Sequence, residues 1–154
     1  MRNTILFVSA LILFAASSIV SAQADDKEAV KVPLENYIKA HATGDPKFAR
    51  KAFHTEGNMI WIRDGKYSSE TFDSFIKRAF TGKAVADEDK RKDNRRIESV
   101  DITGNAAMGR IVLDYPNVKF VDYMTLLKIN GEWKIVNKSF HAEPKQAATP
   151  KKTL

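Results

Sequence analysis

Cysteine is absent from this 154-residue chain, which therefore has neither a disulfide framework nor a thiol nucleophile. The patterns G-x-x-x-x-G-K, G-x-G-x-x-G and G-x-S-x-G are also missing, so nothing supports a phosphate loop, a dinucleotide fold or a hydrolase elbow. The three histidines, at 41, 54 and 141, lack H-x-x-x-H or H-E-x-x-H spacing. We predict no metal and no cofactor, and a fold that is held together by burial alone.

Long apolar runs are scarce, and the longest lies at the start of the chain. Arg2, the apolar residues 5–16 and the small-x-small triplet at 22–24 follow the order of an export signal. The run is shorter than the roughly 20 apolar residues that span a bilayer, and no later segment is a candidate. We expect a cleaved signal peptide over 1–24, a periplasmic or secreted location, one domain over 25–143 and a disordered basic tail over 144–154.

Positive charge exceeds negative charge, with a formal net charge of +6. Much of the surplus lies at 89–96 and at 145–152. Both runs lack interleaved aromatic residues, and the first is mixed with acidic ones. We interpret them as a solvated loop and a frayed tail, and predict no nucleic-acid partner and no membrane span after signal removal.

Helical spacing comes first along the mature chain. Apolar residues recur from Val30 to His41, Gly44 ends that pattern, and Asp45-Pro46 begins a second, short helix that includes Phe53 and ends at His54. A β-like stretch follows at 58–63, with a turn at Asp64-Gly65. A third helix, capped by Ser68 or Ser69, is predicted before a connection at 82–96 that has almost nothing to bury.

From residue 97 onward the chain is β-like. Strands at 97–103 and 106–115 and the two strands of a hairpin over 120–141 make a four-strand meander, joined at Gly104-Asn105, Pro116-Asn117 and Asn130-Gly131. Helices followed by an antiparallel sheet predict an α+β arrangement with the helices on one side. A long twisted sheet around three helices makes a cone, whose mouth is a natural pocket.

Asn130-Gly131 favours a type I′ turn, so a regular ladder would place Ile129 opposite Glu132 and Asp122 opposite Ser139. One face would then carry Phe120, Asp122, Met124, Leu126, Trp133, Ile135, Asn137, Ser139 and His141. The other would carry Val121, Tyr123, Thr125, Leu127, Lys134, Val136, Lys138 and Phe140. We assign the first face to the cone interior and the second to a partner.

Three segments together, 37–58, 97–107 and 120–140, resemble the putative lumazine-binding family within the nuclear transport factor 2-like (NTF2-like) superfamily, which also includes SnoaL-like and ketosteroid isomerase-like proteins. The most specific string is FVDYMTLLKINGEWKIVNKSF, with Asp122-Tyr123, Asn130-Gly131 and Trp133; Phe53-His54 is a second marker. Relatives commonly have proline after that histidine, where this chain has Thr55. The resemblance implies a cone-shaped α+β fold, frequently dimeric through the outer sheet face, and no particular activity.

Asp122 is the sharpest candidate for chemistry, since a carboxylate among apolar neighbours has its charged form disfavoured and is then suited to act as a base. Tyr37 and His41 lie four apart on the first helix and could meet it across the cavity. The alternative is structural: Asp122 satisfied by Ser139, Asn137 or water, and Tyr37 and His41 packed in the core. Candidate ligand-binding residues are Trp61, Met59, His54, Phe120, Met124, Asn137, Ser139 and His141.

Three functions remain open. The first is an exported protein that binds a small, apolar or aromatic molecule. The second is a proton-transfer enzyme of the isomerase or dehydratase type, with Asp122 as base and Tyr37 or His41 polarising a carbonyl. The third is a dimeric interaction domain without chemistry, whose surface is the outer sheet face with Tyr123, Thr125, Val136 and Lys138.

Overall fold

A computed structural model describes residues 26–145. The predicted signal peptide and most of the predicted tail lie outside the described residues. After a helical turn at 26–29, the helices are α2 (Lys31–Thr43), α3 (Pro46–Ala52), α4 (Phe72–Ala79) and the short 3-10 helices η1 (Glu88–Lys90) and η2 (Lys92–Asn94). The strands are β1 (Phe53–Arg63), β2 (Lys66–Thr71), β3 (Arg95–Thr103), β4 (Ala106–Asp114), β5 (Val118–Ile129) and β6 (Glu132–Pro144).

Local sequence explains most of the boundaries. Gly44 ends α2 in the left-handed conformation at φ 68°, and the Asp45 side chain caps α3 by accepting from the Lys47 amide. Two predictions were wrong by a few residues. The second helix ends at Ala52, so Phe53 and His54 begin β1, and α4 is capped by Thr71 because β2 extends through the two serines predicted as caps.

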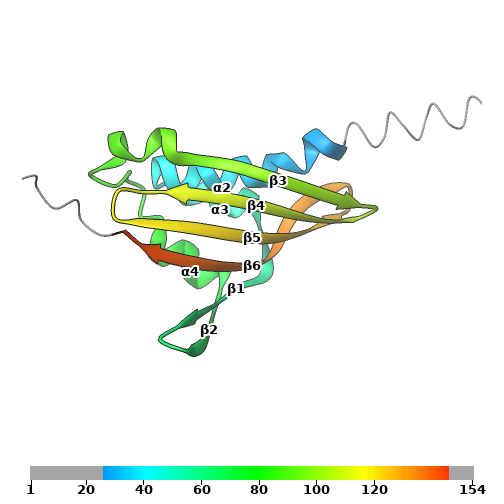
Figure 1. Cartoon of the computed structure of the whole chain (residues 1–154). Coiled ribbons are helices and arrows are strands. Elements are labelled where there is room, and N and C mark those ends of the chain that lie inside the picture. The colour runs from blue at the N-terminus through cyan, green and yellow to red at the C-terminus, as the bar shows by residue number, and fades with distance from the viewer. Residues whose placement is uncertain (1–25, 146–154) are drawn as a thin grey trace, which may run out of the picture.

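The six strands form one sheet in the order β2-β1-β6-β5-β4-β3, with the helices on one side of it (Figure 1). The β3 to β6 meander is antiparallel, as predicted, whereas β1 runs parallel to β6. This confirms the α+β, cone-shaped architecture with three helices on a curved sheet. The core lies between α2, α4 and the inner sheet face, where Leu34, Phe72 and Leu126 are buried.

A β-bulge in β6 changes which side chains face the core. Pairing from the turn is regular through Leu126 opposite Ile135, but Thr125 then pairs with Asn137, so Val136 has no partner. Beyond this point Asp122 lies opposite Phe140, not opposite Ser139. Because side chains alternate along a strand, one extra residue moves everything after it to the other face.

The connection before β3 is anchored, in contrast to the prediction that it has nothing to bury. The Arg95 side chain is almost fully buried and donates to both carboxylate oxygens of Glu88, at 2.6 and 2.5 Å, and to the Tyr115 hydroxyl at 2.9 Å. It also reaches the backbone carbonyl of His41 at 3.5 Å. This guanidinium therefore ties the basic loop to the C-terminal end of α2.

Candidate functional site

Three buried polar side chains meet between α2 and the inner sheet face. Tyr37 comes from α2, Asp122 from β5 and Lys138 from β6, with exposed fractions of 0%, 0% and 5%. The Tyr37 hydroxyl donates to Asp122 Oδ2 at 2.7 Å, and Lys138 Nζ donates to Tyr37 Oη at 2.7 Å. Lys138 Nζ also lies 3.1 Å from Asp122 Oδ2. The result is a compact ion pair bridged by a phenol.

The electrostatics of the Tyr37 hydroxyl agree with this arrangement. Burial raises the pKa of Tyr37 well above its ordinary value, and the charge and hydrogen bond of Asp122 raise it further. Tyr37 therefore stays protonated, and its hydroxyl donates a hydrogen bond to Asp122. Asp122 Oδ1 is shielded from solvent and has no hydrogen-bond partner within residues 26–145.

Aromatic rings surround the ammonium group of Lys138. Its Nζ lies 4.7 Å from the ring centroid of Phe140, 5.1 Å from that of Tyr37 and 5.5 Å from that of Phe75. The negative faces of aromatic rings attract a cation, most strongly where water is excluded. These contacts, with the Asp122 carboxylate, offset part of the cost of removing the charge from water.

Lys138 and Tyr37 form part of the wall of a pocket of about 370 Å³. Its volume falls in the range of small-molecule sites. The lining consists of Tyr37, His41, Met59, Trp61, Arg63, Phe75, Arg78, Leu113, Phe120, Lys138, Phe140 and Ala142. Asp122 is not part of this lining. It contacts two residues that are, Tyr37 and Lys138.

His41 adds an uncharged imidazole to the same pocket. Its ring meets Tyr37 edge to face at 4.7 Å and Phe80 at 5.1 Å between centroids. Burial lowers the pKa of His41 well below its ordinary value, and the positive charges of Lys138 and Arg95 lower it further. Its Nε2 atom is shielded and has no partner within the described part of the chain.

The structure brings together only some of the residues proposed from sequence. Tyr37, His41, Met59, Trp61 and Phe120 line the pocket, as predicted for a shared site, and Asp122 lies directly behind two of its wall residues. Met124 is fully buried opposite Lys138, outside the lining. His54 lies at another hollow, near Arg50 and Phe72, where its Nδ1 accepts from the Glu56 amide.

The inner-face placement of Asn137, Ser139 and His141 was wrong. All three follow the bulge at Val136 and lie on the outer face, in register with Thr125, Tyr123 and Val121. Asn137 donates to Asn58 there. The same shift brings Lys138 and Phe140, which were assigned to the outer face, into the pocket. Sequence reasoning missed both, because no residue near 136 signals a bulge.

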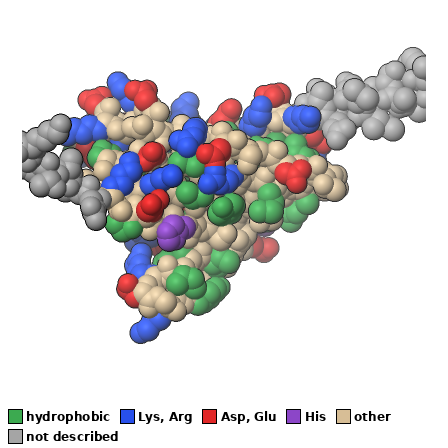
Figure 2. Space-filling view, in the orientation of Figure 1, with side chains coloured by type: hydrophobic (Ala, Val, Ile, Leu, Met, Phe, Trp, Pro, Cys, Tyr) green, Lys and Arg blue, Asp and Glu red, His purple; other side chains and the backbone are tan. Residues whose placement is uncertain are grey.

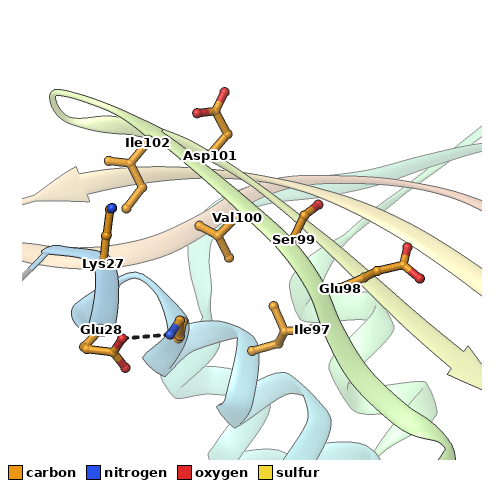
Figure 3. A pocket seen from close by; sticks show the side chains of 9 residues that line it. Lys27, Glu28, Ile97, Glu98, Ser99, Val100, Asp101 and Ile102 are labelled. Carbon is orange, nitrogen blue, oxygen red and sulfur yellow. Dashed lines mark hydrogen bonds and ion pairs between the residues drawn. The ribbon is translucent and has the colours of Figure 1, made fainter. Parts of the chain in front are cut away.

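A second hollow, of about 750 Å³, lies between the start of the helical region and the edge strand β3 (Figure 3). Lys27, Glu28 and Lys31 face Ile97, Val100 and Ile102 across it. It is larger, but it is an open groove and none of its polar lining residues is buried. We therefore regard the smaller pocket, with its buried charge pair, as the candidate site.

Two features are absent from the described residues. No group of three or more His, Cys, Asp and Glu side chains within 26–145 is arranged to hold a metal ion. None of the helices in that range has the length and apolar character needed to cross a membrane.

The fold belongs to the NTF2-like class. An NTF2-like protein of unknown function from Silicibacter pomeroyi is 25% identical, with a TM-score of 0.67, and the alignment covers 79% of this chain and 98% of that one. A similar protein of unknown function from Shewanella baltica is 23% identical, with a TM-score of 0.69 and coverage of 79% and 97%.

Within that class, this chain belongs to the family described as putative lumazine-binding, whose model matches residues 25–141. Among curated proteins, the aldolase FrzH of a Cladobotryum species is 26% identical, and the match covers 71% of this chain and 85% of that protein. The family assignment confirms the resemblance drawn from the three sequence segments.

Proposed function

We propose that this protein binds a small organic molecule in the pocket beside Lys138, with an apolar body among the aromatic side chains and a hydrogen-bond acceptor at the ammonium group. An ammonium has three N–H donors; one donates to Tyr37, and the Asp122 carboxylate forms an ion pair with the group at 3.1 Å. A remaining N–H is available to a carbonyl oxygen of a ligand. The observation that carries this proposal is a buried charge on the wall of a pocket whose lining is largely apolar and aromatic.

Native mass spectrometry tests this proposal. The purified protein, incubated with a cell extract and desalted, should carry an added small-molecule mass. Ala142→Trp should abolish the added mass, because Ala142 lines the pocket and a large ring there fills it. Ala106→Trp is the matched control, an exposed strand alanine outside the lining, and should retain it. An added mass that survives in Ala142→Trp would place the ligand elsewhere and contradict the proposal.

A second candidate function is carbon-acid chemistry, favoured by the aldolase relative and by His41 on the same pocket wall as Lys138. In such a step an imidazole takes a proton from the carbon beside a carbonyl, and the negative charge that develops on the carbonyl oxygen is stabilised by the Lys138 ammonium. The negative charge of Asp122 would neutralise the positive charge of that ammonium group. The geometry favours His41 over Asp122 as the proton acceptor, because Asp122 does not line the pocket.

One assay distinguishes the binding function from the enzyme function. For a ligand identified by mass spectrometry, His41→Gln should abolish exchange of the carbon-bound proton with deuterium oxide while leaving affinity within about twofold, if the enzyme function holds. If the wild-type protein binds the ligand but does not exchange its carbon-bound proton, the enzyme function is contradicted and the binding function stands.

Two accompanying proposals concern location and assembly. We propose that the chain is exported to the periplasm or secreted, on the basis of the order of residues 1–24. We also propose that it forms a homodimer through the outer sheet face, where Ile62, Tyr67, Met108 and Tyr123 are exposed. Lys138 does not belong to that face, since it points into the pocket.

A further inference from the structure

The charged residues that line the pocket are all of one sign. Arg63, Arg78 and Lys138 are among its lining residues, and no carboxylate is. The chain as a whole has 25 basic and 19 acidic residues, so the lining is more one-sided in charge than the whole chain. The rest of the lining is apolar or aromatic, apart from Tyr37 and His41.

The three cations differ in how far their charge is already neutralised. Lys138 is paired with Asp122 at the inner end. Arg78, whose side chain is 62% exposed, holds Glu70 through two hydrogen bonds of 2.7 and 3.2 Å, and this bonding lowers the pKa of Glu70 so that it stays a carboxylate. Arg63 is exposed and has no ion pair within residues 26–145. The uncompensated positive charge therefore lies at the rim.

Trp61 lies beside Arg63 in the lining of the pocket. Its indole N–H is shielded from solvent without any acceptor in the described residues. The guanidinium of Arg63 lies 5.7 Å from the Trp61 ring centroid. A guanidinium is a pure donor with a positive charge, and a carboxylate is the acceptor-only group that fits it.

We propose that the pocket selects amphiphilic carboxylates, with the anionic group at Arg63 and a ring-sized apolar body against Phe120 and Phe140. This inference rests on the proposed function and names the class of ligand for that pocket. A neutral molecule of the same shape would fill the aromatic region but would leave the Arg63 guanidinium without an anionic partner. The proposal thus predicts discrimination by charge at constant ring size.

The test uses two probes with the same ring system, 2-naphthoate and 2-naphthalenemethanol, titrated against the full chain by isothermal calorimetry at low salt. Naphthoate should bind about tenfold more tightly, and the difference should narrow in high salt. Arg63→Gln should weaken naphthoate binding about tenfold and leave naphthalenemethanol unchanged. Lys51→Gln makes the same change in net charge at an exposed residue of a different hollow, and should change neither affinity.

The outcomes separate this inference from the proposed function. Equal binding of the two probes, or no effect of Arg63→Gln, would overturn the selection of anions and leave a binding pocket in place. An equal loss in Lys51→Gln would show that net charge alone attracts naphthoate, and would also overturn it. If neither probe binds, the inference fails together with the pocket as a site for ring-sized molecules.

Discussion

Lys138 is the residue on which the chemistry of the pocket depends most. Its charge is nearly fully buried, and it contacts the Asp122 carboxylate and three aromatic rings, one of which, Tyr37, also accepts its hydrogen bond. A buried ion pair contributes little net stability, since desolvation of both charges offsets their attraction. Its presence at the wall of a pocket is therefore better explained by function than by the stability of the fold.

Removal of one partner of this pair should be far more costly than removal of both. Lys138→Met leaves Asp122 charged, buried and bonded only to Tyr37, so we expect a loss of about 3–5 kcal/mol in the free energy of unfolding. The double variant Lys138→Met with Asp122→Leu removes both charges and should recover most of that loss. Urea denaturation measures the free energy of unfolding of both variants. A double variant that is no more stable than Lys138→Met would contradict the coupling between the two charges.

His41 should make stability depend on pH in a defined window. Its pKa in the folded protein is lowered well below the ordinary value of 6.5, so below that pH the unfolded chain binds a proton that the folded protein does not. The contribution of neutral His41 is complete above pH 6.5 and is lost as the pH falls, with a limiting slope of about 1.4 kcal/mol per pH unit. The protein should therefore be less stable in acid than at neutral pH.

Urea denaturation at a series of pH values from about 7 to about 5 checks this sign. The free energy of unfolding should fall less steeply in His41→Phe, which keeps an aromatic ring against Tyr37 and Phe80. His54 and His141 are present in both proteins and cancel in the comparison. Equal slopes in the two proteins would contradict the assigned role of His41.

At the scale of elements, β6 is irregular along both of its edges at the same residue. Val136 has no partner on β5, and on β1 the pairing jumps from Phe53 opposite Ile135 to Asn58 opposite Asn137. Gly57 lies inside this jump. A Cβ atom there would come within 2.5 Å of the Phe72 ring and 2.7 Å of the Val136 carbonyl oxygen. The close approach of β1 to the bulge therefore requires glycine.

Gly57→Ala should accordingly be more destabilising than the same change at another crowded glycine. At Gly57 the obstacles are a backbone carbonyl and a ring stacked on Phe53 at 4.0 Å, neither of which can move easily. At Gly109 the nearest obstacle, at 2.8 Å, is a methyl group at the end of the Leu34 side chain, which can shift more easily than a backbone carbonyl. We expect a loss of about 2–3 kcal/mol for Gly57→Ala and under about 1 kcal/mol for Gly109→Ala, measured by thermal or urea denaturation.

The sequence predicted those parts of the elements that depend on local chemistry. Asn130 and Gly131 both have positive φ, at 51° and 84°, as the type I′ turn requires, and Asp64-Gly65 behaves in the same way. The pairing of Ile129 with Glu132 follows from that turn. The register beyond Val136 could not be predicted, because the bulge depends on how β1 packs against β6, and β1 lies far away in the sequence.

At the scale of the whole molecule, one face of the sheet is covered by helices and the other is open. Hydrophobic side chains are visible across the open face in the space-filling view (Figure 2), and the exposed apolar residues on it include Ile62, Tyr67, Met108, Tyr123 and Leu127. Apolar side chains spread over an exposed sheet are typical of an interface. This pattern supports the proposed homodimer.

Analytical ultracentrifugation tests the dimer directly. Wild-type protein at micromolar concentration should sediment as a dimer, and the pair Ile62→Asp with Tyr123→Lys should shift it to monomer while the fold is retained. Val85→Asp, an exposed apolar residue outside the sheet, is the control and should leave the dimer intact. A wild-type monomer at high concentration would refute this assembly.

The whole-molecule architecture was accessible from sequence because helices, turns and alternation are each encoded by nearby residues. The site was accessible only in part. Tyr37, His41 and Asp122 were identified from helical spacing and from an acidic residue in an apolar strand, and they do lie together. Lys138 was assigned to the wrong face, so the counter-charge of Asp122 was missed, and with it the reason why Asp122 is tolerated in the interior.

The unpaired residue in β6 also determines how related chains can differ. A homologue that lacked this single insertion would turn the equivalents of Asn137, Ser139 and His141 inward and those of Lys138 and Phe140 outward, since neighbours in a strand point to opposite sides. One codon gained or lost there would exchange an ammonium-bearing cavity for an amide- and imidazole-bearing one. A single indel in a shared scaffold is thus a direct route to a new ligand specificity.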